Sequence, residues 1–323
     1  MARIVGMKEI QSEVWNSTIG PRFTSALNRI KDTGADVPGQ LLHFTSAHAL
    51  TQILRTHKLR LSRARSSNDP KELEYGLGLA RDVAKAILDR NVRWDEILFR
   101  ELILSLAGRV RDGSSQPLPD PHVCCFSQPE CETAVEHWSL YGRAGAGFAL
   151  VFDGPSLAAN PSASLVRVTY DIEEQKGRFS SLIGEAREIC VAARDRMAGL
   201  GAVDEIERIH QSAAHGFGGV LAVHAATMKR DMFKFEKEWR LMVSWIPVKI
   251  PNRDTPLECQ VEAVGPLLRS FYELQFDPRS LKAIVVGPQH ADVNRSVVDA
   301  LLNQYGYEDV EVRVGSVSLR TFQ

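Results

Sequence analysis

The stretch LLHFTSAHALTQILRTHKLRLSRARSSNDP, residues 41–70, sets the organisation of the chain. It begins with a short apolar run that ends in His43-Phe44-Thr45 and is a candidate strand. Apolar residues from 49 to 54 then recur at helical spacing, and residues 58–62 alternate with the period of a half-buried strand. A histidine and a hydroxyl group therefore lie where a strand gives way to a helix. The free N–H groups at the start of a helix suit a phosphate or another polar ligand.

The composition is that of an ordinary globular protein, with 323 residues, of which 44% are hydrophobic and 24% charged. A chain of this length can form one large domain or two ordinary ones. The formal net charge of -1 gives no global sign of a nucleic-acid or membrane partner. No apolar run approaches the ~18–20 residues that span a bilayer, and the N-terminus lacks the features of a signal peptide. Because five cysteines in so long a chain make no disulfide framework, we expect a reduced, cytoplasmic protein.

Strand-like and helix-like segments come in separated groups. Residues 1–40 predict a helical preface, and residues 41–323 predict the main domain, with helical insertions at about 71–110 and 172–230. Shorter helices are expected at residues 133–141 and 291–306. Strands are expected at residues 41–44, 58–62, 122–127, 148–152, 164–170, 235–248, 281–288 and 310–319. This pattern favours an α+β fold with a mixed or antiparallel sheet over a regularly alternating α/β fold.

Two later stretches carry aromatic and acidic residues that suit a site shared with His43, although a lone strand histidine is more often structural than catalytic. Trp138 and Tyr141 lie three residues apart in an expected helix, where they either pack in the core or form a stacking platform for a flat ring. Glu236 and Glu238 would share one face of a strand. An exposed pair is ordinary, whereas a pair that lines a cleft can bind a cation or sugar hydroxyls and stabilise an oxocarbenium-like transition state.

Other clusters have simpler interpretations. The locally basic stretch Arg55–Arg65 is either a solvated face or a contact for a pyrophosphate or a nucleic-acid backbone. In the segment Asn68-Asp69-Pro70-Lys71-Glu72, an N-cap, a proline at the first helical position and a capping box explain most of the pattern, so we leave it out of the catalytic set. Three cysteines lie between His122 and His137, but C-x-x-C spacing is absent and we expect no metal site. The sequence also lacks the glycine motifs of Rossmann and P-loop nucleotide sites.

Several of these stretches together resemble the DUF2971 family, a mostly bacterial family of unknown function. The resemblance covers roughly residues 41–290 and is specific as a combination, although each motif alone is weak. The motifs that carry it are His43-Phe44-Thr45, Asn68-Asp69-Pro70-Lys71-Glu72, Cys125-Phe126-Ser127, Trp138-Ser139-Leu140-Tyr141, Gly147-Phe148-Ala149-Leu150-Val151-Phe152 and Glu236-Lys237-Glu238-Trp239-Arg240.

That family in turn resembles remote members of the ADP-ribosyltransferase superfamily. The resemblance implies a split β-sheet core with helical insertions that clasps NAD between two small sheets. His43 would hold the adenosine-side ribose, Thr45 would bond the nicotinamide amide, and Ser127 would support the strand below. The full set of cofactor-binding residues that we expect is His43, Phe44, Thr45, Arg63, Ser127 and Trp138.

The same resemblance implies catalytic roles for three residues. Tyr141 would stack on the nicotinamide, Glu238 would bond the ribose 2'-OH and stabilise the oxocarbenium ion, and Glu236 would orient the acceptor. The expected activity is NAD-dependent ADP-ribosyl transfer, with NAD as substrate and a protein or nucleic acid as acceptor. A bacterial toxin or antiphage defence effector with an antitoxin or defence-system partner is the setting that this implies. The alternatives are a non-catalytic nucleotide- or nucleic-acid-binding module on the same fold, and an NAD glycohydrolase.

Overall fold

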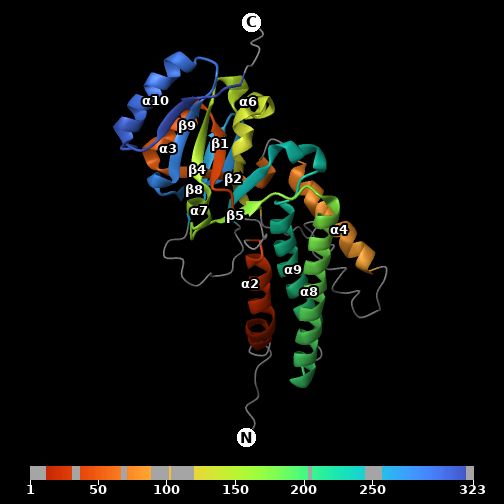
Figure 1. Cartoon of the computed structure of the whole chain (residues 1–323). Coiled ribbons are helices and arrows are strands. Elements are labelled where there is room, and N and C mark those ends of the chain that lie inside the picture. Colours follow the sequence, from red (N-terminus) through yellow and green to blue (C-terminus); the bar gives the residue numbers. More distant parts are fainter. Residues whose placement is uncertain are drawn as a thin grey trace.

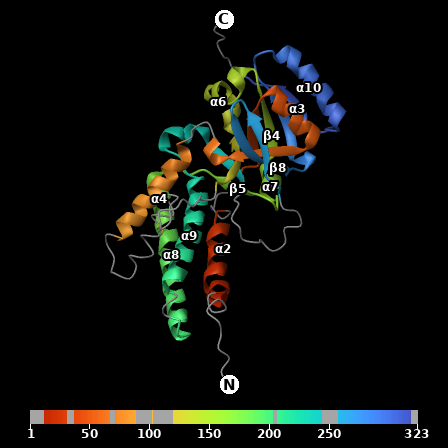
Figure 2. The ribbon, with the colours of Figure 1, turned by 180° about the vertical axis from the view of Figure 1, so that it is seen from behind.

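The chain forms an α+β fold in which a large β-sheet lies beside a layer of long helices (Figure 1). The structure is a computed structural model, and it describes residues 12–30, 37–66, 71–88, 102, 120–202, 206–243 and 257–317. Figures 1 and 2 show helices α2, α4, α8 and α9 side by side below one end of the sheet, whereas α3 and α10 cover one of its faces. The α+β class expected from the sequence is confirmed.

The sheet has ten strands in the described part of the chain and is mostly antiparallel. The strands are β1 Gln40–Thr45, β2 Lys58–Arg63, β3 His122–Ser127, β4 Phe148–Asp153, β5 Ser164–Arg167, β6 Glu238–Val243, β7 Gln260–Val264, β8 Leu267–Gln275, β9 Leu281–Val286 and β10 Glu311–Val314. Their order is β10-β9-β4-β1-β3-β2-β8-β7, with β6 paired to β3 and β5 paired to β6. The pairing of β10 with β9 is parallel.

The sheet divides at β3. One edge of β3 pairs with β6 along its whole length, from His122 to Ser127. On its other edge, β1 pairs only at Ser127 and β2 pairs only at His122 and Val123. Because β1 and β2 diverge, the backbone of residues 124–126 has no strand partner on that edge. An opening therefore forms in the middle of the sheet.

The helices fall into two groups. The first group accompanies the sheet and comprises α3 Ala47–Thr56, α6 Val135–Leu140, α7 Gly154–Ala158 and α10 Ala291–Tyr305. The second group is the helical layer, comprising the π-helix η1 Trp15–Ile19, which continues into α2 Gly20–Asn28, and α4 Glu72–Leu88, α8 Ile172–Gly199 and α9 Ile206–Ala225. Short 3₁₀ helices are η2 Ala64–Ser66, η3 Pro129–Thr133, η4 Arg143–Gly145, η6 Asp231–Glu236 and η7 Pro278–Ser280. Ser46 caps α3, as its position in the sequence allows, because its side chain accepts a hydrogen bond from the Ala49 N–H.

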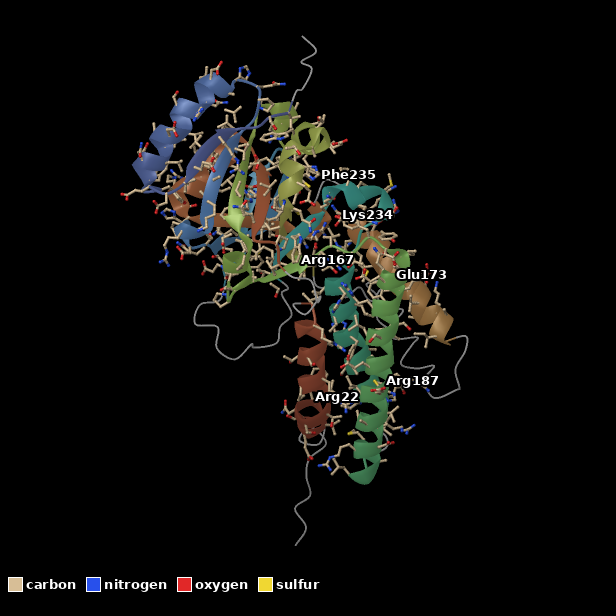
Figure 3. All side chains as sticks on the ribbon, in the orientation of Figure 1. Arg22, Arg167, Glu173, Arg187, Lys234 and Phe235 are labelled. Carbon is tan, nitrogen blue, oxygen red and sulfur yellow. The ribbon has the colours of Figure 1, made fainter. Side chains whose placement is uncertain are left out.

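Each group of helices has its own apolar core. Leu50, Ile53 and Leu54 of α3 pack with apolar residues of β1, β4 and β9 on one face of the sheet. The helical layer buries a second cluster between α4, α8 and α9 and extends it to Val166 of β5 and Met242 of β6. The exposed Glu173 lies in the first turn of α8, and Arg187 lies further along the same helix (Figure 3). The helical layer is thus anchored on the β5–β6 end of the sheet.

One element was missed by the sequence analysis, one expected strand begins later than predicted, and one motif lies outside the described residues. The β7–β8 hairpin was not expected from the sequence. The strand expected over residues 235–248 begins only at Glu238, because residues up to Glu236 form η6. Asn68-Asp69-Pro70 lie outside the described residues. Among the described residues, no helix has the length and apolar character needed to cross a membrane.

Gly76 lets α4 approach α9 at backbone distance, because a Cβ atom at this position would lie 2.6 Å from the Ala225 carbonyl oxygen. We predict that Gly76→Ala lowers the free energy of unfolding by about 1–3 kcal/mol through overpacking. Gly78→Ala in the same helix is the matched control, since the nearest atom to its Cβ is a flexible Arg81 nitrogen at 3.8 Å. This control should raise stability by about 0.5–1 kcal/mol through helix propensity. Urea unfolding measures both changes, and equal effects of the two variants would contradict the close-contact argument.

Candidate functional site

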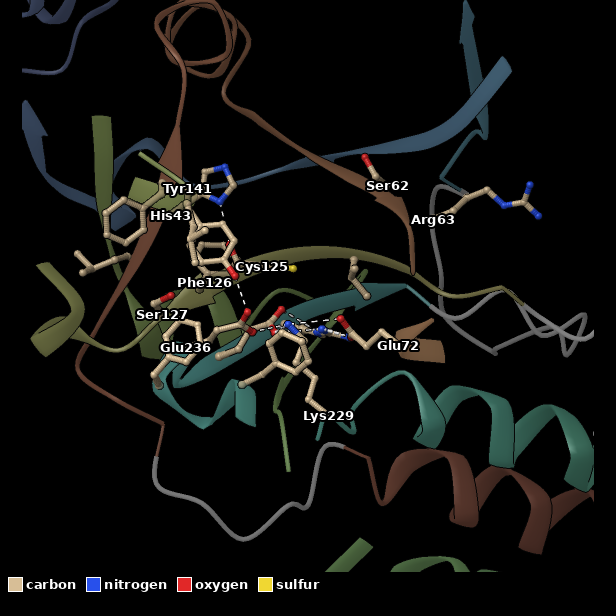
Figure 4. A pocket seen from close by; sticks show the side chains of 18 residues that line it. His43, Ser62, Arg63, Glu72, Cys125, Phe126, Ser127, Tyr141, Lys229 and Glu236 are labelled. Carbon is tan, nitrogen blue, oxygen red and sulfur yellow. Dashed lines mark hydrogen bonds and ion pairs between the residues drawn. The ribbon is translucent and has the colours of Figure 1, made fainter. Parts of the chain in front are cut away.

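A cavity of about 650 Å³ opens where the sheet divides (Figure 4). Its walls come from β1, β2, β3, β6, α4, α6 and the segment between α9 and β6. The lining residues are Leu42, His43, Phe44, Ser62, Arg63, Glu72, Val123, Cys125, Phe126, Ser127, Leu140, Tyr141, Lys229, Phe233, Phe235, Glu236, Glu238 and Arg240. Its volume lies within the range of small-molecule and cofactor sites, about 300–1,000 Å³.

Glu236 and Glu238 both reach the cavity, but not as neighbours on one face of a strand. Glu236 ends η6 and Glu238 begins β6. Between them Lys237 has a left-handed backbone with φ of 44°, a conformation that non-glycine residues rarely adopt. This turn, and not the period of a strand, directs the two carboxylates to the same place. Both residues are buried, at 5% and 4% exposure.

The two carboxylates belong to a buried cluster of five charged side chains. Lys229 contacts Glu236, lies 2.6 Å from Glu238 and lies 3.4 Å from Glu72. Arg240 donates two hydrogen bonds to the Glu238 carboxylate, from Nε at 2.8 Å and from Nη2 at 3.0 Å. It also contacts Glu72. Three carboxylates therefore surround two cations, and each charge has at least one opposite charge beside it.

The surroundings in the cluster shift the pKa values of its members. Burial alone would raise the pKa of Glu238, but Arg240 and Lys229 outweigh it and lower that pKa to about 2. Burial would lower the pKa of Lys229, but the three carboxylates raise it above its ordinary value. Burial is the dominant influence on Glu72 and raises the pKa of that carboxyl group. Glu238 and Lys229 are therefore both charged at neutral pH.

The helical layer holds Lys229 in place. The backbone N–H of Lys229 donates to the Thr169 carbonyl oxygen at 3.1 Å. The side chain of Gln175 in α8, which is fully buried, donates to the carbonyl oxygens of both Thr169 and Lys229, at 2.6 and 2.7 Å. The Tyr75 hydroxyl of α4 donates to the Gln175 side chain at 2.7 Å. The helices thus position one of the two cations of the cluster.

Helix α6 and the residue after it hold Glu236 from the other side. The Tyr141 hydroxyl donates to the Glu236 carboxylate, and burial with this contact raises the pKa of Tyr141. One helical turn earlier, His137 Nε2 donates to the Glu236 carbonyl oxygen at 3.3 Å. The neighbouring Phe235 lies beside α6, with its ring 6.1 Å from that of His137 (Figure 3).

Trp138 does not line the cavity and is not the stacking platform that the sequence suggested. It is fully buried against Leu42 and the edge of Phe44, and its ring N–H donates to the Glu132 carbonyl oxygen at 2.7 Å. The core interpretation of Trp138 therefore holds. Trp138 and Tyr141 are three residues apart in the sequence, and of the two only Tyr141 lines the cavity.

The side chain of His43 lies at the edge of β3 that has no strand partner. Its Nδ1 donates to the Cys125 carbonyl oxygen at 2.9 Å, because a carbonyl oxygen can only accept. Burial lowers the pKa of His43, so the ring is neutral at pH 7 with the proton on Nδ1. This leaves Nε2 as an acceptor. Thr45, two residues further along β1, is buried and lies outside the cavity lining, so the site does not include it.

The Cys125 thiol faces the cavity next to Glu238. Desolvation in the cavity and the Glu238 carboxylate raise the pKa of Cys125 well above its usual range, which makes it a poor nucleophile. Cys124 points to the opposite face of β3, and burial raises its pKa to about 12. The described residues contain no disulfide bond, and no group of three His, Cys, Asp or Glu side chains among them is arranged to hold a metal ion.

The basic stretch around β2 is paired with acidic residues. Lys58 contacts Glu273 at 2.9 Å, and Arg60 contacts Glu262. Arg63 and Arg65 share Asp120. Arg63 also lines the cavity. Most of these basic side chains thus lie beside a carboxylate, as is usual for a solvated face.

The cavity therefore brings together most of the residues suggested by the sequence and adds others. His43, Phe44, Arg63, Ser127, Tyr141, Glu236 and Glu238 line it, whereas Thr45 and Trp138 do not. The sequence reasoning missed Glu72, Lys229 and Arg240. Glu72 was interpreted as part of a capping box, and Arg240 was quoted only as part of a motif. Nothing in the local pattern around Lys229 distinguishes it from an exposed lysine.

The comparisons with known proteins point to one family. Residues 137–241 match the family model described as "Protein of unknown function (DUF2971)". The matched segment contains Tyr141, Lys229, Glu236, Glu238 and Arg240, and it ends within β6. This match supports the family assignment made from the motifs. No match was found among curated proteins or among solved structures.

We predict that Lys229→Met lowers the free energy of unfolding by about 3–5 kcal/mol, because it leaves buried carboxylates without their shared cation. Lys237→Met is the matched control, since Lys237 forms an exposed pair with Glu130 at 2.7 Å. The control should cost at most about 1 kcal/mol. Chemical denaturation measures both values. A loss below 1 kcal/mol for Lys229→Met would contradict the account of the cluster.

Stability should fall as the protein is acidified below about pH 6.5, the reference value for histidine. Burial lowers the pKa of His43, His122, His137 and His224, the last to about 3. The unfolded chain therefore binds protons first as the pH falls, which favours unfolding. His224 alone should account for about 2 kcal/mol between pH 7 and pH 5. Urea titrations at the two pH values test this, and equal stability would be inconsistent with four histidine rings that are neutral in the folded protein.

Proposed function

We propose that the protein binds NAD in this cavity, cleaves its bond to nicotinamide and transfers ADP-ribose to a protein or nucleic-acid acceptor. The setting would be a bacterial toxin or an antiphage defence effector. The observation that carries the proposal is the convergence of His43, Tyr141 and the pair Glu236 and Glu238 on one cavity from separate segments. On this proposal, the sheet that divides at β3 is an ADP-ribosyltransferase-like core that holds NAD at its opening.

The two carboxylates would take different parts in the reaction. Arg240 and Lys229 already occupy both oxygens of Glu238, so Glu238 would act mainly through its fixed charge. Each Glu236 oxygen accepts one hydrogen bond, from Tyr141 or Lys229, and an ionised carboxylate can accept about four. Glu236 would therefore have room for a ribose hydroxyl.

Departure of nicotinamide would leave positive charge on the ribose. Carboxylates held in place before the reaction stabilise such charge in an enclosed cavity more strongly than they would in water. The low pKa of Glu238, about 2, keeps its carboxylate ionised for this role at any physiological pH. His43, neutral and with a free acceptor nitrogen, would bond a ribose hydroxyl, and the Tyr141 ring would lie against the nicotinamide.

We predict that Glu236→Gln and Glu238→Gln each lower nicotinamide release from NAD by about 10²- to 10³-fold, since each removes a key electrostatic contact. Glu130→Gln is the matched control, because Glu130 is an exposed carboxylate paired with Lys237 outside the cavity lining. Release of labelled nicotinamide measures the rate, and thermal unfolding confirms that each variant is folded. Near-wild-type turnover in a folded Glu238→Gln variant would exclude the proposed role of Glu238.

The reaction products separate the proposal from its alternatives. ADP-ribosyl transfer labels a macromolecule, whereas an NAD glycohydrolase releases free ADP-ribose. Binding of NAD without release of nicotinamide would indicate a non-catalytic nucleotide-binding module.

A further inference from the structure

Strand β10 forms one edge of the sheet. Among the described residues it pairs only with β9, in parallel from Glu311 to Val314. The opposite side of β10 therefore offers backbone N–H and C=O groups to which another strand can hydrogen-bond. Val314 is 40% exposed and Glu311 is exposed as well, so side chains at this edge are also accessible.

The side chains around β10 are complementary to themselves. The sequence reads Val310-Glu311-Val312-Arg313-Val314, which is symmetric about Val312 except that the two charges are opposite. Because side chains alternate along a strand, the three valines share one face and the two charged residues share the other. Two antiparallel copies centred on Val312 place Val310 opposite Val314 and Glu311 opposite Arg313, each pair twice. Apolar pairs and opposite-charge pairs of this kind both stabilise neighbouring strands.

The charged pair can form between two copies without leaving a charge unpaired. Glu132 holds Arg313 by accepting hydrogen bonds from Nε at 3.0 Å and from Nη2 at 2.5 Å. The remaining nitrogen of Arg313, Nη1, donates to Glu311 of the same strand at 3.1 Å. The Glu311 side chain is 64% exposed, so this ion pair is weak and can be exchanged for one with Glu311 of a second copy.

The other edge of the sheet lacks this complementarity. It is formed by β7, where Val261 is 62% exposed. Glu262 is the single charged residue of β7, and it already contacts Arg60 of β2. No antiparallel pairing of β7 with its own copy therefore brings opposite charges of the strand together. The charge pattern favours β10 as the contact edge and a second copy of the chain as its partner.

We propose that two copies of the protein associate through antiparallel pairing of β10 about Val312. The sheet then continues across a two-fold axis perpendicular to it, so the same surface serves both copies. Helix α10 lies on one face of the sheet (Figure 1), remains on that face and runs antiparallel to its copy. The cavity stays open in both copies, because β9, β4 and β1 separate β10 from β3. The association does not depend on which ligand the cavity binds.

The first experiment measures the molar mass of the full-length protein by sedimentation equilibrium, over about 1–200 µM, a range that suits a small interface. The expected result is a monomer–dimer equilibrium with a dissociation constant of roughly 1–100 µM. Protein that stays monomeric throughout this range overturns the proposal. A mass that rises beyond that of the dimer also overturns it, because a two-fold contact closes on itself.

A matched pair of lysine variants identifies the edge. Val314→Lys should weaken the dimer at least about tenfold, because it puts a charge into an apolar contact that the two-fold axis repeats. Val261→Lys is the control, since it changes an exposed valine on the opposite edge of the sheet, and it should leave the dissociation constant unchanged. An unaffected dimer in Val314→Lys, or loss of the dimer in Val261→Lys, overturns the assignment to β10.

Charge reversal tests the register. Glu311→Arg places arginines opposite each other and should weaken the dimer at least about tenfold, and Arg313→Glu should do the same with glutamates. An equal mixture of the two variants should form a heterodimer, since every arginine then faces a glutamate. Thermal unfolding shows whether each variant is folded, and folded variants that do not associate on mixing overturn the register. If Arg313→Glu does not fold without its contact to Glu132, a Glu311→Arg dimer as tight as the wild type overturns it instead.

Discussion

The cavity depends on the buried ion cluster that ties the helical layer to the sheet. Glu72 begins α4, Lys229 follows α9, and Glu238 and Arg240 lie on β6. Buried charges stabilise a fold only when each has its partners, and the removal of one leaves the others uncompensated. The helices are therefore part of the site as well as a support for the sheet, because they position Lys229, which contacts both Glu236 and Glu238.

The position of Glu236 shows how much structure is needed to fix one carboxylate. Its carbonyl oxygen is held by His137 and its carboxylate by Tyr141 and Lys229. The left-handed backbone of Lys237 costs free energy of order 1–3 kcal/mol, which the surrounding contacts must offset. Such constraints are typical of sites that must present a group in one geometry.

The sequence predicted those parts of the site whose structure is set by local patterns of residues. The apolar run before His43 forms a strand, and so does the late motif from Glu238 onward. Tyr141 faces the cavity from the end of a helix. The sequence did not predict the role of residues whose position depends on contacts between segments far apart in the chain. Glu72 has a complete local explanation as a capping residue, and its pairing with Arg240 becomes visible only in three dimensions. Trp138 has the same spacing signal as Tyr141, and only the packing of Leu42 and Phe44 shows that it belongs to the core.

The division of the sheet at β3 also bears on aggregation. An unpaired strand edge is a template on which another chain can add, and proteins normally cover or blunt such edges. Here the bare edge of residues 124–126 faces inward, and the His43 side chain occupies the Cys125 carbonyl oxygen that a neighbouring strand would have used. One imidazole thus takes the place of a strand, and the protein can keep an opening within its sheet without presenting that edge to other molecules.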